Sequence, residues 1–285
     1  MRDDAIAKLA SSAISPAEAA DAGIFSVSDA STLHPSFAAV PALAFPYYQP
    51  DGAAMRWGDE AAEFIRVRYL AAVYPKRRGV KKKLIRYAQP PQSGLKAYFP
   101  WVGDPAGESA WTEILDDPKA AVVITEGELK ALCSCLCEVP TIGLGGVYNF
   151  ATYDGKLLPE LAAIDWQGRT AYIAFDSDAV MKPEVAVAEA RLVDALVQRG
   201  ARPALVRIPP TDDGGKRGID DFVEQEGSAA WRRLLNETLP LSGVDKGVIM
   251  LNEHLAWIER EAKAIDVNTY TFLSATSLEK GSRYS

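Results

Sequence analysis

The sequence predicts an α/β protein whose parallel β-sheet is flanked by helices and preceded by a small, mixed, β-rich and basic segment. Over residues 120–226, short apolar runs typical of buried strands alternate with stretches whose apolar residues recur with a helical period. Upstream, short β-type runs follow one another between Pro, Gly and Asp residues. The expected strands of the parallel sheet are 120–125, 141–144, 171–175 and 204–208, and those of the upstream segment are 43–48, 64–70 and 96–101.

Residues that favour helix ends place several helices. A short helix is expected over 3–10, and Ser15 with Pro16 fits the N-cap and first position of a second one. Pro183 begins an amphipathic helix that Gly200 ends. Four parts are therefore expected: a helical arm (1–38), a β-rich basic subdomain (39–118), an α/β domain (119–227) and a C-terminal helical extension or the start of a following module (228–285).

Composition narrows the classes of function. The 285 residues include 31 Lys and Arg against 38 Asp and Glu, so the net charge of −7 excludes a uniformly basic nucleic-acid coat. Three cysteines within one short segment give no disulfide framework, and neither a secretory signal nor an apolar stretch of membrane-spanning length is found. A cytoplasmic protein without a membrane partner is expected. With only two histidines, neither a His-centred triad nor a zinc site is easily assembled, so the chemistry must depend on carboxylates.

Acidic residues follow the expected strands at three places. EGELKA (126–131) follows the first strand of the α/β domain, FDSDA (175–179) follows the third, and GIDDF (218–222) comes after the last. Because the carboxyl ends of parallel strands face one edge of a sheet, these side chains can converge there. Clustered carboxylates suit Mg²⁺ or Mn²⁺, and two such ions can promote an in-line phosphoryl transfer. The candidate metal ligands are Glu126, Asp176, Asp178, Asp220 and Asp221.

Each motif alone has a simpler interpretation. An Asp-Xaa-Asp after a strand is often turn chemistry or a helix cap. Cys133 and Cys137, four residues apart on an expected helix, are interpreted as small buried apolar groups. Lys216 and Arg217 either bind a triphosphate or balance Asp220 and Asp221.

Taken in order, and with GLGG (143–146) after the second strand, the motifs resemble the Toprim domain of DnaG-type bacterial primases, topoisomerases and some nucleases. The resemblance implies that Glu126, Asp176 and Asp178 are catalytic, with Glu126 as a general acid/base or metal-linked carboxylate. It also implies that Asp176 and Asp178 hold Mg²⁺ (or Mn²⁺) and that Asp220 and Asp221 add carboxylates on the metal side. The range 119–227 would then be the Toprim catalytic domain.

Primase-like Toprim proteins of phages, plasmids and other mobile elements are the most similar group. Their EGEXKA, GLGGVXN and GXDDF motifs stand here as EGELKA, GLGGVYN and GIDDF. One departure is DSDAVMKP (176–183), where primases often have a glycine after Asp-Xaa-Asp-Xaa-Ala. By the same resemblance, 83–99 corresponds to a segment that binds template and nucleotide.

A basic strip between residues 66 and 96 contains ten Lys or Arg and no acidic residue. Such a strip fits binding to the phosphate backbone, with interleaved Tyr69, Tyr74, Tyr87 and Tyr98 stacking on unpaired bases, although a solvated surface loop would look similar. Lys130 and Asn149 are further candidates for contact with the substrate. The candidate nucleic-acid and nucleotide ligands are Arg66, Arg68, Lys76, Arg77, Arg78, Lys81, Lys82, Lys83, Arg86, Lys96, Lys130 and Asn149.

The leading hypothesis is a primase-like nucleotidyltransferase that joins nucleotides on single-stranded DNA by two-metal phosphoryl transfer, in the replication of a mobile element, phage or plasmid. Its partners would be single-stranded DNA, nucleoside triphosphates and a replicative helicase. Two alternatives stay open. A Toprim nuclease would use the same carboxylates with water as the attacking group, and a non-catalytic module would only bind single-stranded nucleic acid within a replication complex.

Overall fold

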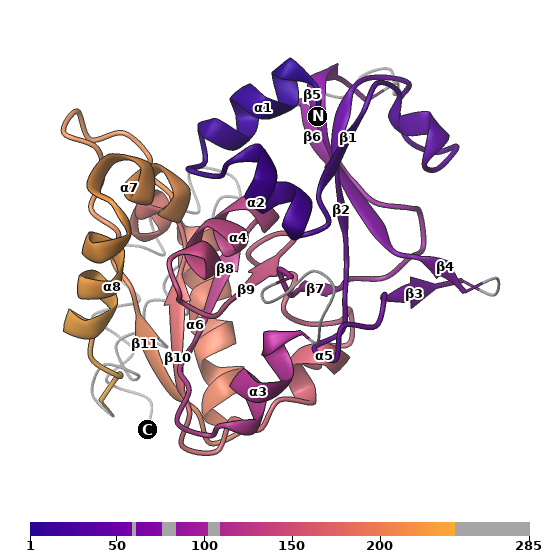
Figure 1. Cartoon of the computed structure of the whole chain (residues 1–285). Helices are drawn as coiled ribbons and strands as arrows, with labels where there is room; N and C mark the ends of the chain where they lie inside the picture. The colour runs from indigo at the N-terminus through magenta and orange to yellow at the C-terminus, as the bar shows by residue number, and fades with distance from the viewer. Residues whose placement is uncertain (59–60, 76–83, 102–108, 243–285) are drawn as a thin grey trace, which may run out of the picture.

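The computed structural model describes residues 1–58, 61–75, 84–101 and 109–242. Their secondary structure forms two main sheets with helices packed around them (Figure 1). Within these ranges, every helix falls short of the length and apolar character needed to cross a bilayer. The mixed α/β class expected from the sequence is confirmed.

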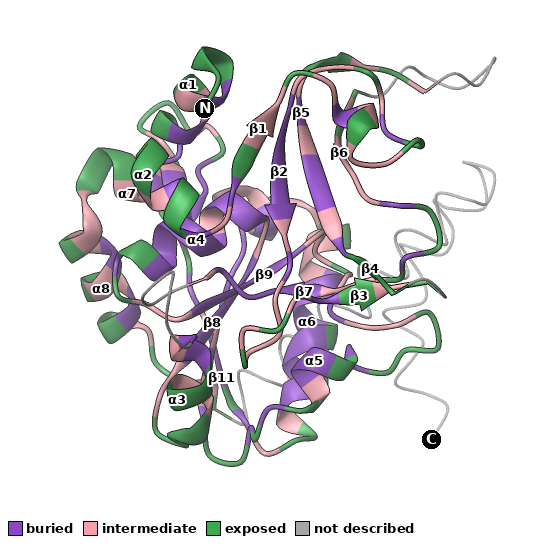
Figure 2. Cartoon of the chain, turned by 45° about the vertical axis from the view of Figure 1, so that its right-hand side comes forward, coloured by how far each residue is buried: buried purple, intermediate pink, exposed green. Residues whose placement is uncertain are grey.

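The upstream sheet is antiparallel and has four strands in the order β1-β2-β5-β6. These are β1 (Phe25–Val27), β2 (Ala42–Pro46), β5 (Ile65–Val73) and β6 (Ile85–Ala88). The first four residues of β2 are buried, so this strand is the apolar centre of the sheet (Figure 2). A separate two-stranded ribbon, β3 (Arg56–Trp57) and β4 (Ala62–Glu63), projects beside it.

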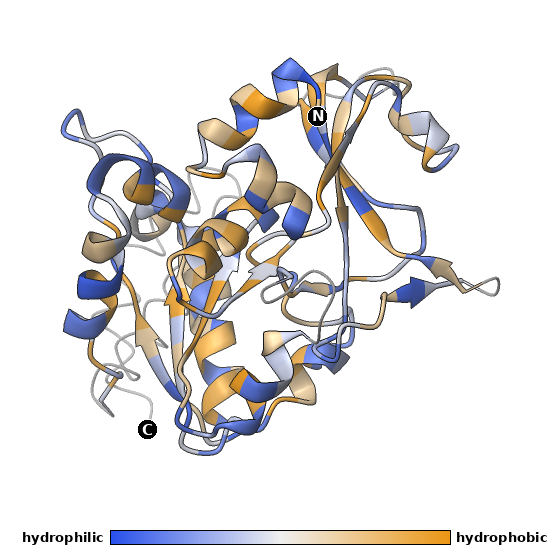
Figure 3. Cartoon of the chain, in the orientation of Figure 1, coloured by the Kyte–Doolittle hydropathy of each residue, from blue (hydrophilic) through white to orange (hydrophobic). Residues whose placement is uncertain are grey.

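The second sheet has five strands in the order β11-β10-β8-β9-β7. The strands β8 (Val122–Glu126), β9 (Thr141–Leu144), β10 (Thr170–Ala174) and β11 (Arg202–Leu205) run parallel, and β7 (Ala97–Tyr98) is antiparallel to β9 at the edge. The parallel strands are apolar runs because both faces of the sheet are covered (Figure 3). Their carboxyl ends, where Glu126 pairs with Leu144, share one edge.

Helices cover both faces of this sheet. One face carries α7 (Ile219–Glu226) and α8 (Ser228–Glu237), whose Phe222 and Trp231 pack in one cluster with Val123 of β8. The other face carries α6 (Pro183–Val197), whose Leu192 packs in the main core with Ile124 of β8. The helix α4 (Glu128–Leu136) follows β8 directly and contacts α7. Apart from α1 and α2 of the N-terminal arm, the remaining described helices are α3 (Ala110–Asp116), α5 (Pro159–Ala162) and the 3-10 turns η1 (Ala30–Thr32) and η2 (Ser177–Met181).

The N-terminal arm begins with α1 (Asp3–Ala10) and α2 (Pro16–Asp21), the two helices that the sequence predicts, and its later residues include β1. Ser15 accepts a hydrogen bond from the Glu18 amide while Glu18 accepts one from the Ser15 amide, which closes a capping box. The expected end of α6 is also confirmed, because Gly200 adopts a φ of +83° just beyond it. The helix expected after residue 228 is present as α8.

Several expected elements differ from the structure. The strand expected over 96–101 is reduced to two residues, and β7 pairs with β9 of the second sheet instead of staying with the upstream strands. The last parallel strand spans Arg202–Leu205 instead of 204–208, and Arg207, beyond its end, pairs with Glu189. Most of the C-terminal extension, 243–285, lies outside the described residues.

A fully buried arginine, Arg169, ties the start of β10 to the loops around it. Its guanidinium donates hydrogen bonds to the carbonyl oxygens of Ala120 (2.7 Å), Leu115 (2.7 Å), Asp165 (2.9 Å) and Ile114 (3.3 Å). We expect Arg169→Lys to lower the free energy of unfolding by about 3 kcal/mol, because an ammonium cannot reach carbonyls on several sides and buried acceptors lose their donors.

Urea unfolding followed by circular dichroism would measure this change. Arg199→Lys is the matched control, since Arg199 is exposed and donates to the Ala162 carbonyl at 3.3 Å. Its effect should stay within about 0.5 kcal/mol. Equal losses in the two variants would contradict the structural role given to Arg169.

Candidate active site at the carboxyl edge of the parallel sheet

A pocket of about 550 Å³ lies at the edge where β8 and β10 end. Glu126 is the last residue of β8, Asp176 follows β10 by two residues, and Asp220 with Asp221 stands in the first turn of α7. These four predicted carboxylates all line the pocket, as the parallel-sheet rule requires. The other lining residues are Lys8, Arg66, Arg68, Leu84, Arg86, Tyr87, Gly127, Glu128, Leu129, Lys130, Gly145 and Lys216. We call this space the carboxylate pocket.

Asp176 is the most strongly paired of these acids. Its side chain is 5% exposed and forms ion pairs with the ammonium groups of Lys130 and Lys216. Burial alone would raise the pKa of Asp176, but the two lysines outweigh burial and hold the pKa below its ordinary value of 3.8. Burial would likewise lower the pKa of Lys130, yet Asp176 raises it above the ordinary value. Both partners are therefore charged at neutral pH.

Asp220 is buried, and its two carboxylate oxygens differ in their hydrogen bonding. Oδ2 accepts a hydrogen bond from the Ser12 hydroxyl at 2.7 Å, whereas Oδ1 is buried without a hydrogen-bond partner. Gly218 lies directly beside it. A Cβ atom at Gly218 would stand 2.9 Å from Asp220 Oδ1, 3.0 Å from Asp176 Oδ1 and 2.7 Å from Lys130 Cε, so only glycine leaves this space free. Two carboxylate oxygens from different elements thus face one small gap.

A second charged network joins the upstream sheet to α4. Arg66 of β5 donates to Glu128 Oε1 at 2.7 Å and to the Gly145 carbonyl at 2.9 Å, and Tyr47 donates to the same Glu128 oxygen at 2.8 Å. Arg66 and Glu128 are 10% and 1% exposed. Arg66 was expected to meet nucleic acid; its guanidinium here holds the loop after β9 against the start of α4, and Gly145 leaves room for it.

Asp178 and Asp221 have other local partners. Asp178 pairs with Lys182 at 2.6 Å and lines a second cavity beside Val206 and Ile208, which Asp176 lines as well. Asp221 accepts the Gly218 amide at 2.9 Å and so caps α7. Among the described residues, no three His, Cys, Asp or Glu side chains come close enough together to form a metal-binding group.

The donor chemistry nevertheless fits a hard divalent cation at one place. Carboxylate oxygens are the ligands such ions prefer, and the gap at Gly218 holds the unpartnered Asp220 Oδ1 next to Asp176 Oδ1. Glu126 lines the same pocket. Asp176 and Asp220 are the side chains that would hold an ion at this gap, with Glu126 elsewhere on the pocket wall, and Lys130 or Lys216 would have to release Asp176 to admit it.

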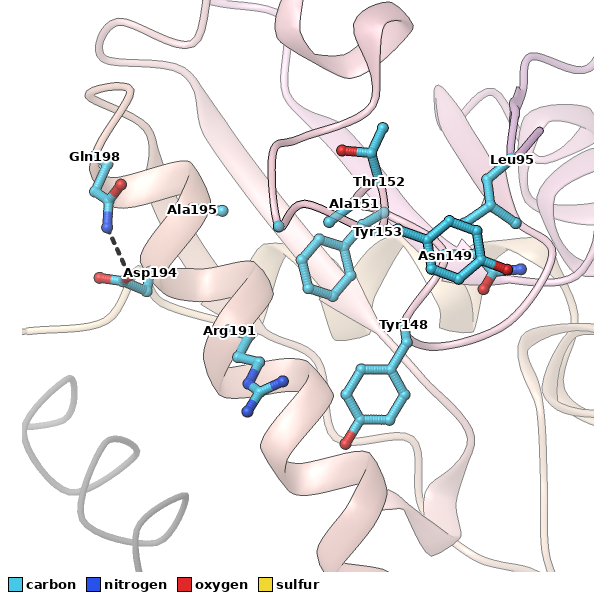
Figure 4. A pocket seen from close by; sticks show the side chains of 12 residues that line it. Leu95, Tyr148, Asn149, Ala151, Thr152, Tyr153, Arg191, Asp194, Ala195 and Gln198 are labelled. Carbon is cyan, nitrogen blue, oxygen red and sulfur yellow. Dashed lines mark hydrogen bonds between the residues drawn. The ribbon is translucent and has the colours of Figure 1, made fainter. Parts of the chain in front are cut away.

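The predicted nucleic-acid and nucleotide ligands fall into four groups. Arg66, Arg68, Arg86 and Lys130 line the carboxylate pocket, and Arg86 is exposed. Lys96 lies elsewhere and pairs with Glu160 at 3.4 Å. Six others lie outside the described residues: Lys76, Arg77, Arg78, Lys81, Lys82 and Lys83. Asn149 lines a separate pocket of about 580 Å³ between the 148–155 loop and α6, together with Tyr148 and Arg191 (Figure 4).

Most of the tyrosines expected to stack on bases pack against other residues of the protein. Tyr69 and Tyr98 are buried in the two cores, so the expectation is wrong for them. The guanidinium groups of Arg66 and Arg68 both lie near the Tyr87 ring, 5.1 Å and 5.3 Å from its centroid, and the Tyr87 hydroxyl accepts from Arg68. Tyr74 remains half exposed.

Three residues of the site were not among the expected ligands. Glu128 stands inside the EGELKA motif, so its place in the motif was a usable signal. Lys8 lines the carboxylate pocket, and Ser12 contacts Asp220, yet both belong to the N-terminal arm. An Ala- and Ser-rich helical arm carries no motif that separates Lys8 and Ser12 from their neighbours. Their role depends on a contact across 208 positions of sequence.

A family model described as a domain of unknown function (DUF3854) matches residues 110–230. No curated protein matches the sequence. The solved structure of the Aquifex aeolicus primase, comprising zinc-binding and RNA polymerase domains, is similar with a TM-score of 0.54 and 15% identity, over 89% of this chain and 67% of that one.

Two further solved structures agree. The DnaG primase catalytic domain bound to single-stranded DNA has a TM-score of 0.52 and 10% identity, over 88% of this chain and 74% of that one. The RNA polymerase domain of Mycobacterium tuberculosis primase DnaG has a TM-score of 0.52 and 15% identity, over 100% of this chain and 88% of that one. The chain has a primase-like fold. At these identities the similarity concerns the fold alone, and the primase-like fold spans both the upstream sheet and the parallel sheet.

The ion pairs of Asp176 make its contribution to stability depend on pH. Since the folded-state pKa lies below 3.8, this contribution is complete above that pH and is lost as the pH falls through the lower, folded-state pKa. We expect Asp176→Asn to be less stable than the wild type by an amount that is constant near neutrality and shrinks in acid.

Urea unfolding across a pH series would follow this difference. Asp212→Asn is the control, because Asp212 is exposed and lies outside the carboxylate pocket. Its difference from the wild type should stay near zero throughout. A gap between wild type and Asp176→Asn that stays unchanged in acid would show that Asp176 is not stabilised as a charged group.

Proposed function

We propose that the chain is a primase-like nucleotidyltransferase that synthesises short oligonucleotides on single-stranded DNA. The observation that carries this proposal is the carboxylate pocket: Glu126, Asp176 and Asp220 meet cationic side chains at the carboxyl edge of a parallel sheet in a primase-like fold. One pocket thus combines oxygen ligands for a divalent ion with cations for phosphate groups.

The residues have distinct proposed roles. Glu126, Asp176 and Asp220 hold Mg²⁺ or Mn²⁺, with Asp221 beside them and Asp178 reaching the site only if Lys182 releases it. Bound there, the ions would neutralise phosphate charge and promote attack by a 3′-hydroxyl. Lys130 and Lys216, once freed from Asp176, bind the phosphates of a nucleoside triphosphate. Arg68 and Arg86 on the upstream sheet bind the template backbone.

The proposal also includes the domain boundaries and the biological setting of the protein. The Toprim motifs support a Toprim catalytic domain over 119–227, with the upstream subdomain over 39–118 and the arm over 1–38. The similarity of EGELKA, GLGGVYN and GIDDF to mobile-element primases supports a place in the replication of such an element, where a helicase would be the natural partner.

A Toprim nuclease is the second candidate, because the same carboxylates and ions can activate water. The basic strip between residues 66 and 96 and the GIDDF motif favour the joining of nucleotides over hydrolysis. A binding module without catalysis would need the basic side chains but not the acids. The two alternatives are separated from the first by the reaction product and by the effect of a chelator.

Primer synthesis should depend on the acids of the pocket. Single-stranded template, labelled nucleoside triphosphates and Mn²⁺ should yield short products with the wild type, and Glu126→Gln and Asp176→Ala should each reduce the yield at least about a hundredfold. Asp212→Asn should retain the wild-type yield. Denaturing gels would resolve the products by length.

The outcome separates the candidates. Products that persist in both acid variants would refute the proposal, and cutting of DNA by the wild type without nucleoside triphosphates would favour the nuclease. Binding of single strands that is indifferent to chelator and to Asp176→Ala, with no product of either kind, would indicate the binding module.

Binding of single-stranded DNA should weaken as salt rises, because each neutralised phosphate releases counterions. Arg86→Ala should lower the slope of log K against log salt by about 0.7, the value for one phosphate of a single strand. Fluorescence anisotropy with a labelled oligonucleotide would measure the slope. Lys119→Ala, an exposed cation outside the pocket, should leave it unchanged. Identical slopes for Arg86→Ala and wild type would remove Arg86 from the binding surface.

A further inference from the structure

The N-terminal arm reaches the carboxylate pocket through the turn after α1. Ser12 is completely buried in this turn, and its hydroxyl donates to Asp220 Oδ2 at 2.7 Å. Lys8, one turn earlier on the same face of α1, donates to the Ser12 hydroxyl oxygen at 2.9 Å and lines the pocket. A segment outside the expected catalytic domain therefore contacts one of the pocket acids directly.

The direction of these hydrogen bonds is fixed by chemistry. An ammonium group only donates, so the Ser12 oxygen must accept from Lys8. The single hydroxyl hydrogen of Ser12 is then left for Asp220, whose Oδ2 accepts it at 2.7 Å. The chain of donors runs from Lys8 through Ser12 to Asp220, and no other arrangement of hydrogens satisfies all three groups.

The hydrogen bonds from Lys8 to Ser12 and from Ser12 to Asp220 fix the orientation of the Asp220 carboxylate. Because Oδ2 is engaged by Ser12, Oδ1 is the oxygen left at the gap beside Gly218, buried and without a partner, with Asp176 Oδ1 on the same gap. Rotation of the carboxylate out of this orientation would break the bond to Ser12. An orientation held in advance is what a ligand group needs if it is to bind an ion without reordering.

The N-terminal arm is fixed in position by packing into the main apolar core. Ala5, Leu9 and Ile14 are at most 2% exposed and belong to the main apolar core, together with Leu129 and Leu132 of α4. The position of Ser12 is thus tied to the same core as the helix that follows β8. Its hydroxyl cannot move away from Asp220 without disturbing this packing.

We infer that Ser12 is a positioning residue of the candidate metal site, which the N-terminal arm completes. Ser12 acts through Asp220: it holds Oδ2 so that Oδ1 faces the cation together with Asp176. The inference rests on the proposed function for the identity of the ligand, and it adds a role for the arm that the motifs of the α/β domain do not contain.

The test is Mn²⁺ binding by the full chain, measured by isothermal titration calorimetry. Ser12→Ala should weaken Mn²⁺ binding about tenfold or more, the range found when a group that orients a metal ligand is removed. Ser11→Ala is the matched control. Ser11 is exposed and receives a hydrogen bond from the same Lys8 ammonium at 3.0 Å, but no contact joins it to Asp220. Its affinity should stay within about twofold of wild type.

Two further variants guard against a purely structural effect. Ser12→Cys keeps a group of similar size with a weak donor, so it should weaken Mn²⁺ binding while changing the melting temperature less than Ser12→Ala. The double variant Ser12→Ala with Asp220→Asn should bind Mn²⁺ no more weakly than Asp220→Asn alone, because Ser12 acts through that carboxylate.

The results separate this inference from the proposed function. Wild-type affinity in Ser12→Ala and Ser12→Cys, or additive losses in the double variant, would overturn the role of Ser12 while the metal site and primer synthesis stand. A lower melting temperature without weaker Mn²⁺ binding would overturn it too. A wild type that binds no Mn²⁺ would overturn both.

Discussion

Buried carboxylates at the edge of the parallel sheet are tolerated only because a partner faces each of them, and these partners come from separate parts of the chain. Asp176 after β10 meets Lys130 of α4 and Lys216 of the loop before α7. Glu128 meets Arg66 of the upstream sheet, and Asp220 meets Ser12 of the arm. An unpaired charge at such depth would cost several kcal/mol, so the same contacts that stabilise the acids also bring the arm, the upstream sheet and the parallel sheet together.

The pairing leaves the pocket close to electrically neutral. Six cations and five acids line it, so a divalent ion at Asp176 and Asp220 would make the pocket clearly positive. Lys130 and Lys216 would then exchange one anionic partner for another, from the carboxylate to a phosphate, without leaving the pocket. The resting ion pairs therefore suit a site whose substrate is a polyanion that arrives with metal, and they leave no buried ammonium unpaired before it arrives.

The sequence predicted what depends on strand order and little of what depends on side-chain partners. The rule for parallel strands brought Glu126 and Asp176 to one pocket because it needs only the strand ends, whereas Asp220 reaches the same pocket from the first turn of α7. Asp178 lies two residues after Asp176, but η2 begins between them and Lys182 follows one turn later, so Asp178 turns toward another cavity. In the sequence Arg66 is one more cation of the basic strip, because no neighbouring residue indicates that Glu128 is its partner.

Residue contacts that form the site cross the domain boundaries expected from the sequence. β7 belongs to the expected upstream subdomain, yet it covers the β9 edge of the parallel sheet, and β1 of the expected arm pairs with β2. Separating the parallel sheet from these segments would expose the backbone of β9, leave Glu128 without Arg66 and leave Asp220 without Ser12. The candidate site is therefore a property of all three parts together, although its motifs lie within one of them.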